Sequence, residues 1–452
     1  MRNLRTFFTP SRIIVFSFAA TILTGALILL LPGTHRVKVS FIDALFMSTS
    51  AVCVTGLSLY DISSQFTHFG QLVIMTLFQI GGLGIMTFSI FFAYILRKDI
   101  SMIGMHTILS TFAPDKKMNR LKLITGVVRF TFIFEGIGAL LLTLYFILEE
   151  SYPLGKAIYY AIFHSISAFC NAGFSLFPDS FMRFKSSLFF NLVITLLIIT
   201  GGIGFIVILE IYYRIKGEIQ SFSLHTKMAL IVTFILITAG TLTIYFLENH
   251  FYFATHHFTT GEKILASYFQ AVTARTAGFN TIDIGALSSG TLFFLVMLMF
   301  IGASPGSTGG GIKTTAAGVL FAVFINRLKG RTNIRFMNRT IGQETVSRAI
   351  AIAISSFILI SLALLTLTFI YQIHPFFKGK DPFLQLLFEE VSAFGTVGLS
   401  TGITPSLDNY SKIVLIILMF VGRVGPLALA FAIGGEGKED KIIYSEENLM
   451  VG

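Results

Sequence analysis

Eight stretches of the 452-residue chain are apolar over a length that could carry them across a lipid bilayer. About 20 apolar residues in a helix span the hydrocarbon core, and a backbone inside lipid must satisfy its own hydrogen bonds, which favours helices. Only 12% of the residues are charged, roughly half the usual share in soluble domains. The sequence therefore predicts an all-α polytopic membrane protein with eight spans. The stretches are residues 13–31, 72–96, 126–148, 188–209, 228–247, 291–301 with a continuation past a break, 350–370 and 413–433.

The first apolar stretch follows three arginines and has the general form of a signal peptide. Residues 30–35 (LLPGTH) offer no small-x-small cleavage site, however. We expect this stretch to be a retained helix.

A nine-residue motif recurs four times between the apolar stretches. It reads SAVCVTGLS at 50–58, SAFCNAGFS at 167–175, VTARTAGFN at 272–280 and SAFGTVGLS at 392–400. The glycine near its end falls at Gly56, Gly173, Gly278 and Gly398, at intervals of 117, 105 and 120 residues. A unit of a little over a hundred residues is thus repeated four times. We expect the units to occupy residues 1–98, 99–215, 216–329 and 330–452.

Each unit has the same order: a spanning helix, a half-length apolar segment, the glycine loop and a second spanning helix. The half-length segments, 42–51, 157–168, 262–272 and 382–393, are too short to cross a bilayer and are better interpreted as re-entrant. Irregular backbone at membrane depth is tolerated only where it lines water or is buried in protein. The sequence therefore predicts four M1-P-M2 (helix, pore loop, helix) repeats around a pseudo-fourfold pore.

The loop chemistry favours a cation. A half-helix that enters the membrane directs the negative end of its dipole toward the membrane centre, and glycine adopts the dihedral angles that expose consecutive carbonyls. Rings of carbonyl oxygens can replace the hydration shell of K⁺, and no acidic side chain lies within the loops themselves. We therefore predict a potassium selectivity filter that coordinates K⁺ through backbone carbonyls. Its residues are Val54, Thr55, Gly56, Asn171, Ala172, Gly173, Thr276, Ala277, Gly278, Thr396, Val397 and Gly398.

Basic residues indicate the orientation of the chain. Alternate loops hold 21 of the 33 lysines and arginines, in the segments 2–12, 97–129, 214–227, 327–348 and 438–441. Such an excess marks the cytoplasmic side. Both termini are then cytoplasmic, and the four glycine loops open outward. The basic loop 327–348 could dock an acidic partner or simply hold the topology.

The second helix of the third unit is interrupted by residues 302–313 (GASPGSTGGGIK). Five glycines and a proline cannot continue a helix. The segment has some likeness to a phosphate-binding loop, but an extra residue precedes Lys313 and a membrane helix flanks it in place of a strand. We expect a mobile gate under the filter. It comprises Ser304, Pro305, Gly306, Ser307, Thr308, Gly309, Gly310 and Gly311.

The second helices of the other units contain GGLG at 81–84, GGIG at 201–204 and GRVG at 422–425. Glycines at this depth permit bending and close helix approach, and packing alone is the simpler interpretation for most of them. Arg423 is costly there and should face the water path or an acidic partner, where it could limit conduction.

Several other residues admit two interpretations. Glu389 and Glu390 could add field near the pore, but intramembrane acids usually have a partner, and we favour pairing. Arg275 should point away from the axis and brace its loop by hydrogen bonds. Cys53 and Cys170 could form a disulfide, but a small buried residue is the simpler interpretation.

An intramembrane enzyme would need a nucleophile paired with a base. His164 and Ser304 are candidates. Residues 302–306 (GASPG) have the letters of a Gly-x-Ser-x-Gly elbow, but a membrane helix flanks them in place of a strand, and nothing in the spacing pairs a histidine with a nucleophile. No metal-ligand spacing and no basic amphipathic segment for nucleic acid are found either. The chain is not expected to be an enzyme.

The four units, the triplets ending in Gly173, Gly278 and Gly398, and the broken third inner helix resemble the Trk/Ktr/HKT superfamily of potassium transporters. The resemblance covers essentially the whole chain and is greatest with the Ktr type of membrane subunit (KtrB or KtrD). In that family a serine at the first filter glycine accompanies sodium transport. Gly56 occupies that position here, which implies a preference for potassium. Cys53 in the first loop departs from the usual pattern.

The resemblance implies a bacterial plasma-membrane protein for potassium uptake, stimulated by sodium. The membrane subunits would form a homodimer above a cytoplasmic, nucleotide-binding regulatory ring (KtrA- or KtrC-like), and nucleotide would bind that ring, with no cofactor in this chain. Residues 304–311 would be the gate and Arg423 its neighbour in the barrier. The rival hypothesis is a sodium-coupled symporter with alternating access, against which the parallel repeats argue.

Overall fold

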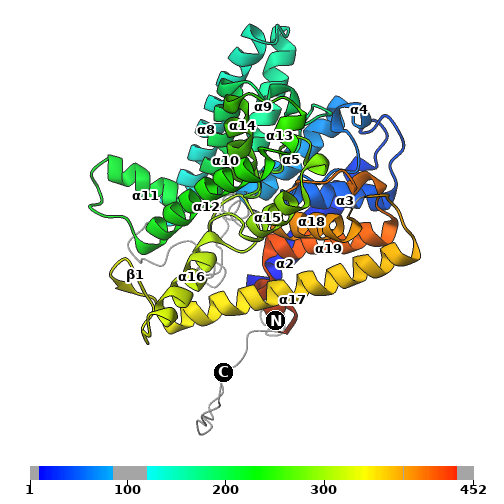
Figure 1. Ribbon diagram of the computed structural model, residues 1–452. Coiled ribbons are helices and arrows are strands. Elements are labelled where there is room, and N and C mark those ends of the chain that lie inside the picture. Colours follow the sequence, from blue (N-terminus) through cyan, green and yellow to red (C-terminus); the bar gives the residue numbers. More distant parts are fainter. Residues whose placement is uncertain (1–9, 85–119, 380, 435–452) are drawn as a thin grey trace, which may run out of the picture.

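The computed structural model describes residues 10–84, 120–379 and 381–434, and these are almost entirely helical (Figure 1). A two-stranded antiparallel hairpin joins β1 (Arg335–Phe336) to β2 (Arg339–Thr340). The helices in chain order are α2 (Pro10–Leu29), α3 (Phe41–Val52), α4 (Ile62–Gln65), α5 (His68–Leu83), α8 (Arg120–Leu148), α9 (Leu154–Phe169), η1 (Met182–Phe184), α10 (Leu188–Gly202), α11 (Phe205–Ile215), α12 (Leu224–Glu248), α13 (Tyr252–Thr255), α14 (Thr260–Thr273), η2 (Ile284–Ala286), α15 (Ser289–Phe300), α16 (Thr314–Leu328), α17 (Gln343–Ile373), α18 (Pro382–Gly395), η3 (Thr404–Ser406), α19 (Asn409–Val424) and α20 (Pro426–Gly434).

One arrangement of helices occurs four times. A first helix packs against a short helix that follows it in the chain, in the pairs α2 with α3, α8 with α9, α12 with α14 and α17 with α18. A glycine loop comes next, and then a further helix, which is α5, α10, α15 or α19. Figure 1 shows α17, the first helix of the fourth group, lying along α18 and α19.

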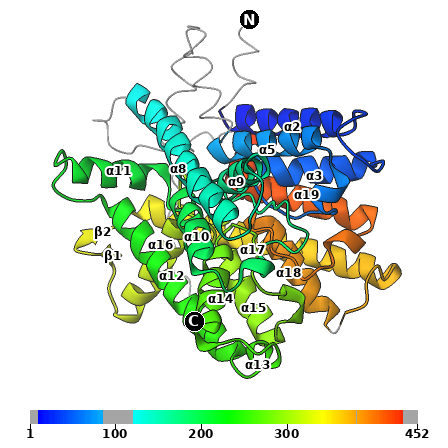
Figure 2. The same ribbon diagram turned by 90° about the horizontal axis from the view of Figure 1, so that it is seen from above.

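Contacts between the four groups run in a closed circle. Each second helix packs on the short helix of the next group: α5 on α9, α10 on α14, α15 on α18, and α19 back on α3. Figure 2 shows the consequence, with the blue first quarter of the chain beside α19 from the last quarter. The sequence therefore forms a ring of four similar groups.

The short helices begin where side chains can cap them. Ser40 accepts a hydrogen bond from the Asp43 backbone N–H at the start of α3, and Thr259 forms a reciprocal capping box with Glu262 at the start of α14. Pro382 occupies the first position of α18, after Asp381 as the cap. Such caps satisfy amides that have no partner in the first turn.

Helix length differs from the prediction of eight spans. In the described ranges, three helices are long and apolar enough to cross a membrane, namely Thr125–Leu148 within α8, α12 and α17. Together α10 and α11 would make a fourth, but they meet at 100°. Residues 85–96 of the second predicted span lie outside the described residues.

Glycines shorten three of the remaining predicted spans, because they interrupt the second helices. α5 ends at Gly84, α11 begins after Gly204, and α19 ends at Gly425, with φ values of 75°, 95° and 95°. Only glycine adopts such angles without strain. The prediction that these glycines permit bending is confirmed at residues 201–204, where α10 and α11 meet at 100°.

A buried ion pair joins the first and last groups, which no segment of chain links directly. Lys412 Nζ lies 2.7 Å from Asp43 Oδ1, and the two side chains are 13% and 11% exposed. Tyr60 and Ser40 each donate to the other carboxylate oxygen of Asp43 at 2.8 Å. Burial, together with the hydrogen bond to Asp43, raises the pKa of Tyr60 above its usual range, so its hydroxyl remains a donor at neutral pH.

Candidate functional site

The four motif glycines meet at one place. A Cβ built on Gly56 would lie 2.6 Å from the carbonyl oxygen of Ala172 and 2.8 Å from the Cα of Gly173. A Cβ on Gly173 would lie 3.2 Å from the Cα of Gly278, one on Gly278 3.1 Å from that of Gly398, and one on Gly398 3.0 Å from that of Gly56. The glycines therefore form a closed ring in sequence order, here called the glycine ring, with no room for side chains between them.

Each loop also has the same backbone conformation. The four glycines have φ values of 91°, 71°, 77° and 90°, and the residue two positions earlier is left-handed as well. Those residues are Val54 (57°), Asn171 (57°), Thr276 (72°) and Thr396 (49°). Such a φ is a genuine outlier for a β-branched residue and costs on the order of 1–3 kcal/mol. Three of the four loops hold a strained β-branched residue at this position, and the second has Asn171, which adopts this conformation more readily. The shared conformation indicates a functional constraint.

Serines of the short helices hold the loops in place. The Gly56 N–H donates to Ser50 Oγ at 3.1 Å, and the Gly398 N–H donates to Ser392 Oγ at 3.0 Å. In the second loop Ser167 Oγ donates to the Phe174 carbonyl at 2.8 Å. The third loop has Val272 at this position and lacks the hydroxyl.

Glycines of the second helices lie against the ends of the short helices. A Cβ on Gly81 would be 2.0 Å from the Val52 carbonyl oxygen, one on Gly201 1.9 Å from that of Phe169, and one on Gly422 1.8 Å from that of Phe394. Each of those carbonyls belongs to the residue four positions before a ring glycine. Close approach, as well as bending, therefore explains glycine at these sites.

The glycine-rich loop 302–313 lies directly beside the glycine ring. The Gly310 N–H donates to Thr396 Oγ1 at 2.9 Å, and a Cβ on Gly309 would lie 2.0 Å from Thr276 Oγ1. Both threonines precede ring glycines in their loops. The loop thus occupies one face of the ring.

Backbone hydrogen bonds hold this loop to two of the interrupted helices. Thr308 N–H donates to the Gly201 carbonyl at 3.2 Å, Ser304 N–H to that of Gly202 at 3.0 Å, and Gly311 N–H to that of Gly422 at 3.3 Å. The remaining predicted gate residues belong to the same segment. Pro305 and Gly306 approach Gly204 and Phe205, Ser307 N–H donates to the Ser304 carbonyl, and Ser304 Oγ is 2.8 Å from Thr314 Oγ1.

Two cations bind consecutive carbonyls of this loop. Arg423 donates from one terminal nitrogen to the Thr308 carbonyl and from the other to the Gly81 carbonyl. Lys313 Nζ donates to the Gly309 carbonyl at 2.7 Å. The sequence identified Arg423, and the structure joins it to the loop through backbone oxygens, with no acidic partner among its described hydrogen bonds. Lys313 was not predicted as part of the site, although a charge within a membrane segment was the available signal.

A cavity of about 290 Å³ lies on the other face of the glycine ring. All four ring glycines line it, together with residues that follow them, such as Ser58 and Ser400. The glycine-rich loop contacts residues that precede the glycines. The ring therefore separates this cavity from the loop.

Glu389 braces the fourth loop. Its carboxylate accepts from Ser400 Oγ at 2.5 Å, Thr401 N–H at 2.9 Å and Thr404 Oγ1 at 2.7 Å. This agrees with the pairing interpretation. Glu390 is fully buried in the same helix, and neither of its carboxylate oxygens has a hydrogen-bond partner among the described residues, so the pairing interpretation is wrong for Glu390.

The hydrogen bonds expected of Arg275 are largely absent. The side chain is buried, at 5% exposed, and its Nε and Nη2 have no hydrogen-bond partner among the described residues. The predicted brace is therefore not seen for these nitrogens. Cys53 and Cys170 are both free and buried, in agreement with the interpretation as small buried residues.

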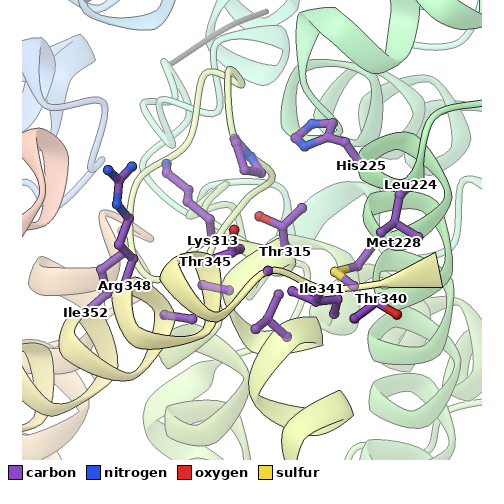
Figure 3. A pocket seen from close by; sticks show the side chains of 15 residues that line it. Leu224, His225, Met228, Lys313, Thr315, Thr340, Ile341, Thr345, Arg348 and Ile352 are labelled. Atoms are coloured by element: carbon purple, nitrogen blue, oxygen red, sulfur yellow. The ribbon is translucent and has the colours of Figure 1, made fainter. Parts of the chain in front are cut away.

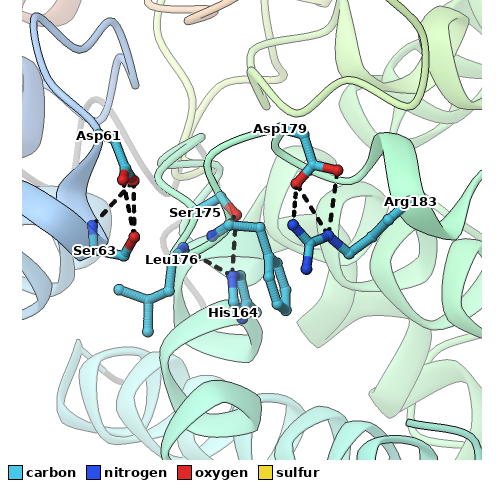
Figure 4. Close-up of polar contacts among 8 residues, drawn as sticks. Asp61, Ser63, His164, Ser175, Leu176, Asp179 and Arg183 are labelled. Atoms are coloured by element: carbon cyan, nitrogen blue, oxygen red, sulfur yellow. Dashed lines mark hydrogen bonds and ion pairs between the residues drawn. The ribbon is translucent and has the colours of Figure 1, made fainter.

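His164 holds the segment that follows the second ring glycine (Figure 4). Its Nε2 accepts from the Leu176 N–H at 3.1 Å and lies 3.2 Å from Ser175 Oγ, while Nδ1 is 2.7 Å from the Tyr160 carbonyl. Figure 4 also shows Asp61 capping Ser63 and the Arg183–Asp179 ion pair nearby. His164 and Ser304 make separate contacts, so the structure does not join them into a catalytic pair.

The sequence analysis missed a buried carboxylate behind the second loop. Gln79 Nε2 donates to both oxygens of Glu135 at 2.9 and 3.1 Å, and Cys170 Sγ is 3.3 Å from Gln79 Oε1. Glu135 is 4% exposed. A lone acid within the apolar stretch 126–148 was the signal that could have identified it.

Residues 5–439 match the protein family described as TrkH, cation transport protein. The chain belongs to this family. TrkH family proteins are transporters, so membership agrees with the expectation that the chain is not an enzyme, and it makes the protein a multi-pass membrane transporter.

Individual relatives support the same assignment over the full length. The chain is 40% identical to Ktr system potassium uptake protein B of Bacillus subtilis, across 98% of this chain and 97% of the relative. It is 37% identical to potassium/sodium uptake protein NtpJ of Enterococcus hirae, across 100% and 99%. The crystal structure of the potassium transporter TrkH from Vibrio parahaemolyticus has the same fold, with a TM-score of 0.72 at 18% identity over 92% of this chain and 83% of that one.

Proposed function

We propose that this protein is the membrane subunit of a Ktr-type potassium uptake system, in which K⁺ passes through the glycine ring. The observation that carries the proposal is the shared geometry of the four loops. All four place a left-handed residue two positions before a left-handed glycine, and the glycines touch in a closed circle. Relatives at 33–40% identity are named as Ktr system potassium uptake proteins.

The filter consists of backbone carbonyls from four triplets. Each short helix ends at its loop and directs the negative end of its dipole there, which favours a cation. Rings of carbonyl oxygens then replace the water that surrounds K⁺. Gly56 places no side chain beside the carbonyls of the first triplet, which is consistent with selectivity for potassium over sodium. The proposed filter residues are the four triplets named from the sequence: Val54 to Gly56, Asn171 to Gly173, Thr276 to Gly278 and Thr396 to Gly398.

The glycine-rich loop is the gate. It lies against the face of the glycine ring opposite the 290 Å³ cavity, where it obstructs the path of an ion leaving the filter. Arg423 and Lys313 hold its carbonyls and add positive charge below the filter. Opening requires the loop to leave Thr396 and Arg423.

The four groups of helices are then M1-P-M2 units at residues 1–98, 99–215, 216–329 and 330–452, around a pseudo-fourfold pore. The excess of basic residues in alternate loops supports a cytoplasmic position for both termini and for the loop 327–348, in a bacterial plasma membrane. A homodimer on a cytoplasmic nucleotide-binding regulatory ring completes the system, as membership in a Ktr system implies.

Sodium dependence is the second candidate property. The relative from Enterococcus hirae is named a potassium/sodium uptake protein. If sodium only activates the protein, K⁺ still moves down its own electrochemical gradient. A sodium-coupled symporter instead moves K⁺ against that gradient when a sodium gradient is imposed.

The test is uptake of K⁺ and Na⁺ by cells that lack their own potassium uptake. The wild-type protein is compared with Gly56→Ser and with a deletion of residues 304–311. Gly56→Ser should weaken K⁺ uptake or admit Na⁺, and the deletion should raise flux. Wild-type behaviour of both variants would refute the filter and the gate together.

A further inference from the structure

A second cavity, of about 640 Å³, lies on the loop side of the glycine ring. It is bounded by the start of α12, the glycine-rich loop, the start of α16, the β1–β2 hairpin and the start of α17. We call it the basal cavity. Much of its wall is apolar, including Met228, Val319, Ile341 and Ile352.

Three groups that are or can become cationic line the apolar wall. Lys313, Arg348 and His225 lie around the same space (Figure 3). His225 Nε2 is shielded from solvent and has no hydrogen-bond partner among the described residues. No acidic side chain is among the residues that line the cavity.

Two long helices also begin at this cavity without a side-chain cap. α16 begins after Lys313 and α17 after Gly342, and neither residue caps its helix with a side-chain hydrogen bond. Thr315 in the first turn of α16 and Thr345 in the first turn of α17 line the cavity. The first turn of a helix offers free amides and a positive dipole end, which attract an anion.

Two acids lie near the cavity, but neither is among the residues that line it. Glu344 forms an exposed ion pair with Arg348 at 2.5 Å, and an exposed pair of this kind contributes little. Glu210 accepts the Ser223 N–H at 3.0 Å at the start of α12.

We propose that the basal cavity binds an anionic phospholipid, with the phosphate between Lys313, Arg348 and the helix starts and the acyl chains on the apolar wall. An apolar wall beside a cationic group fits an amphiphile better than a free ion. The inference rests on the proposed orientation, in which these segments face the cytoplasmic leaflet, the leaflet whose anionic lipids attract basic segments.

Occupancy would act on the gate through Lys313. The ammonium that would meet the phosphate is the one that holds the Gly309 carbonyl. A phosphate competes with that carbonyl for the same hydrogens, because charge-assisted bonds are the stronger ones. Lipid binding therefore loosens the glycine-rich loop and raises K⁺ flux.

The test measures lipid binding to the purified full-length protein by native mass spectrometry, with phosphatidylglycerol, phosphatidylcholine or glycerol phosphate as the probe. Arg348→Gln should lower the affinity for phosphatidylglycerol about tenfold, as expected for loss of one charge-assisted hydrogen bond. Ala316→Phe should lower it by filling the cavity, since Ala316 lines the wall. Arg339→Gln is the matched control, because it removes the same charge from the exposed hairpin but does not line the cavity.

Several results would overturn the proposal. If Arg348→Gln and Ala316→Phe both leave the phosphatidylglycerol affinity unchanged, the cavity is not the binding site. If Arg339→Gln lowers that affinity as much as Arg348→Gln does, the lipid responds only to general surface charge. Equal binding of phosphatidylcholine excludes anion recognition. Binding of glycerol phosphate without phosphatidylglycerol assigns the cavity to a soluble anion instead. Lipid binding is measured independently of transport. A failure of K⁺ transport would therefore refute the proposed function without changing the lipid-binding result.

K⁺ flux in vesicles of phosphatidylcholine, with and without phosphatidylglycerol, tests the link to the gate. Phosphatidylglycerol should raise wild-type and Arg339→Gln flux, and should raise Arg348→Gln flux much less. Equal stimulation of all three would show that the lipid acts elsewhere.

Discussion

Gly398→Ala is the substitution that the glycine ring should tolerate least. A Cβ at this position would lie 2.0 Å from the Thr55 carbonyl oxygen, whereas an ordinary contact is 3.4 Å or more. The same Cβ would lie 3.0 Å from the Cα of Gly56. Backbone atoms cannot rotate away as a side chain can. The clash is therefore relieved only by moving the Thr55 carbonyl, one of the oxygens proposed to coordinate K⁺.

The energy of this substitution has two parts. A left-handed alanine costs about 1–2 kcal/mol, and overpacking costs about 1–3 kcal/mol more. Gly402 supplies the matched control, because its φ is +92° but nothing lies within 4 Å of its Cβ position. Gly402→Ala should incur only the first part. Because the clash displaces a carbonyl proposed to coordinate K⁺, the difference of about 1–3 kcal/mol sets an upper limit of roughly 5- to 150-fold on the loss of K⁺ affinity.

The assay is K⁺ binding and K⁺ flux in reconstituted vesicles, for alanine at each ring glycine. The nearest carbonyl oxygens stand at 2.0 Å for Gly398, 2.5 Å for Gly278, 2.6 Å for Gly56 and 3.0 Å for Gly173. The loss should follow that order, with Gly173→Ala the mildest. Equal behaviour of Gly398→Ala and Gly402→Ala would refute the reasoning, because dihedral strain alone would then account for the loss.

Three further substitutions test the surroundings of the ring. Arg423→Gln should raise K⁺ flux severalfold in vesicles, because it releases the Thr308 and Gly81 carbonyls; unchanged flux would exclude Arg423 as a gate anchor. Glu389→Gln should lower the free energy of unfolding by about 1–3 kcal/mol, because an amide accepts fewer of the bonds from Ser400, Thr401 and Thr404, and a melting curve in detergent at wild-type stability would contradict it. Lys412→Met should lower the free energy of unfolding by about 3–5 kcal/mol, because it leaves Asp43 buried without its cationic partner. In a double-mutant cycle, the double variant with Asp43→Asn should recover part of that loss. Additive effects of the two substitutions would show that the ion pair does not hold the first and last groups together.

The sequence predicted the repeated parts of the molecule well, because repetition is visible without coordinates. The motif that contains Gly56, Gly173, Gly278 and Gly398 located four loops, and the structure brings those loops together. The GxxG segments indicated sites where a helix could bend or approach a neighbour closely, and in the structure helices end or begin at Gly84, Gly204 and Gly425. Helix length was predicted less well, since hydropathy continues through a glycine that ends the helix.

Contacts between distant segments could not be predicted in this way. Lys313 and Gly309 are four residues apart, but nothing in the sequence shows that the side chain turns back to that carbonyl. Arg423 was expected to seek water or an acid, and it binds the backbone of two other units instead. A backbone carbonyl is present at every residue, so its availability as a partner depends on the fold and leaves no trace in composition.

The differences among the four units are concentrated in the third one. Its loop has Val272 where the first, second and fourth loops have a bracing serine, and it contains the buried Arg275. Its second helix is also the one replaced at its centre by the glycine-rich loop. A ring of four strained loops requires close geometric agreement at the glycines, but it needs only one moving part below them. On the proposed function, three units therefore maintain the coordination geometry, and the third contributes its glycine to the same ring while its second helix is free to specialise as the gate.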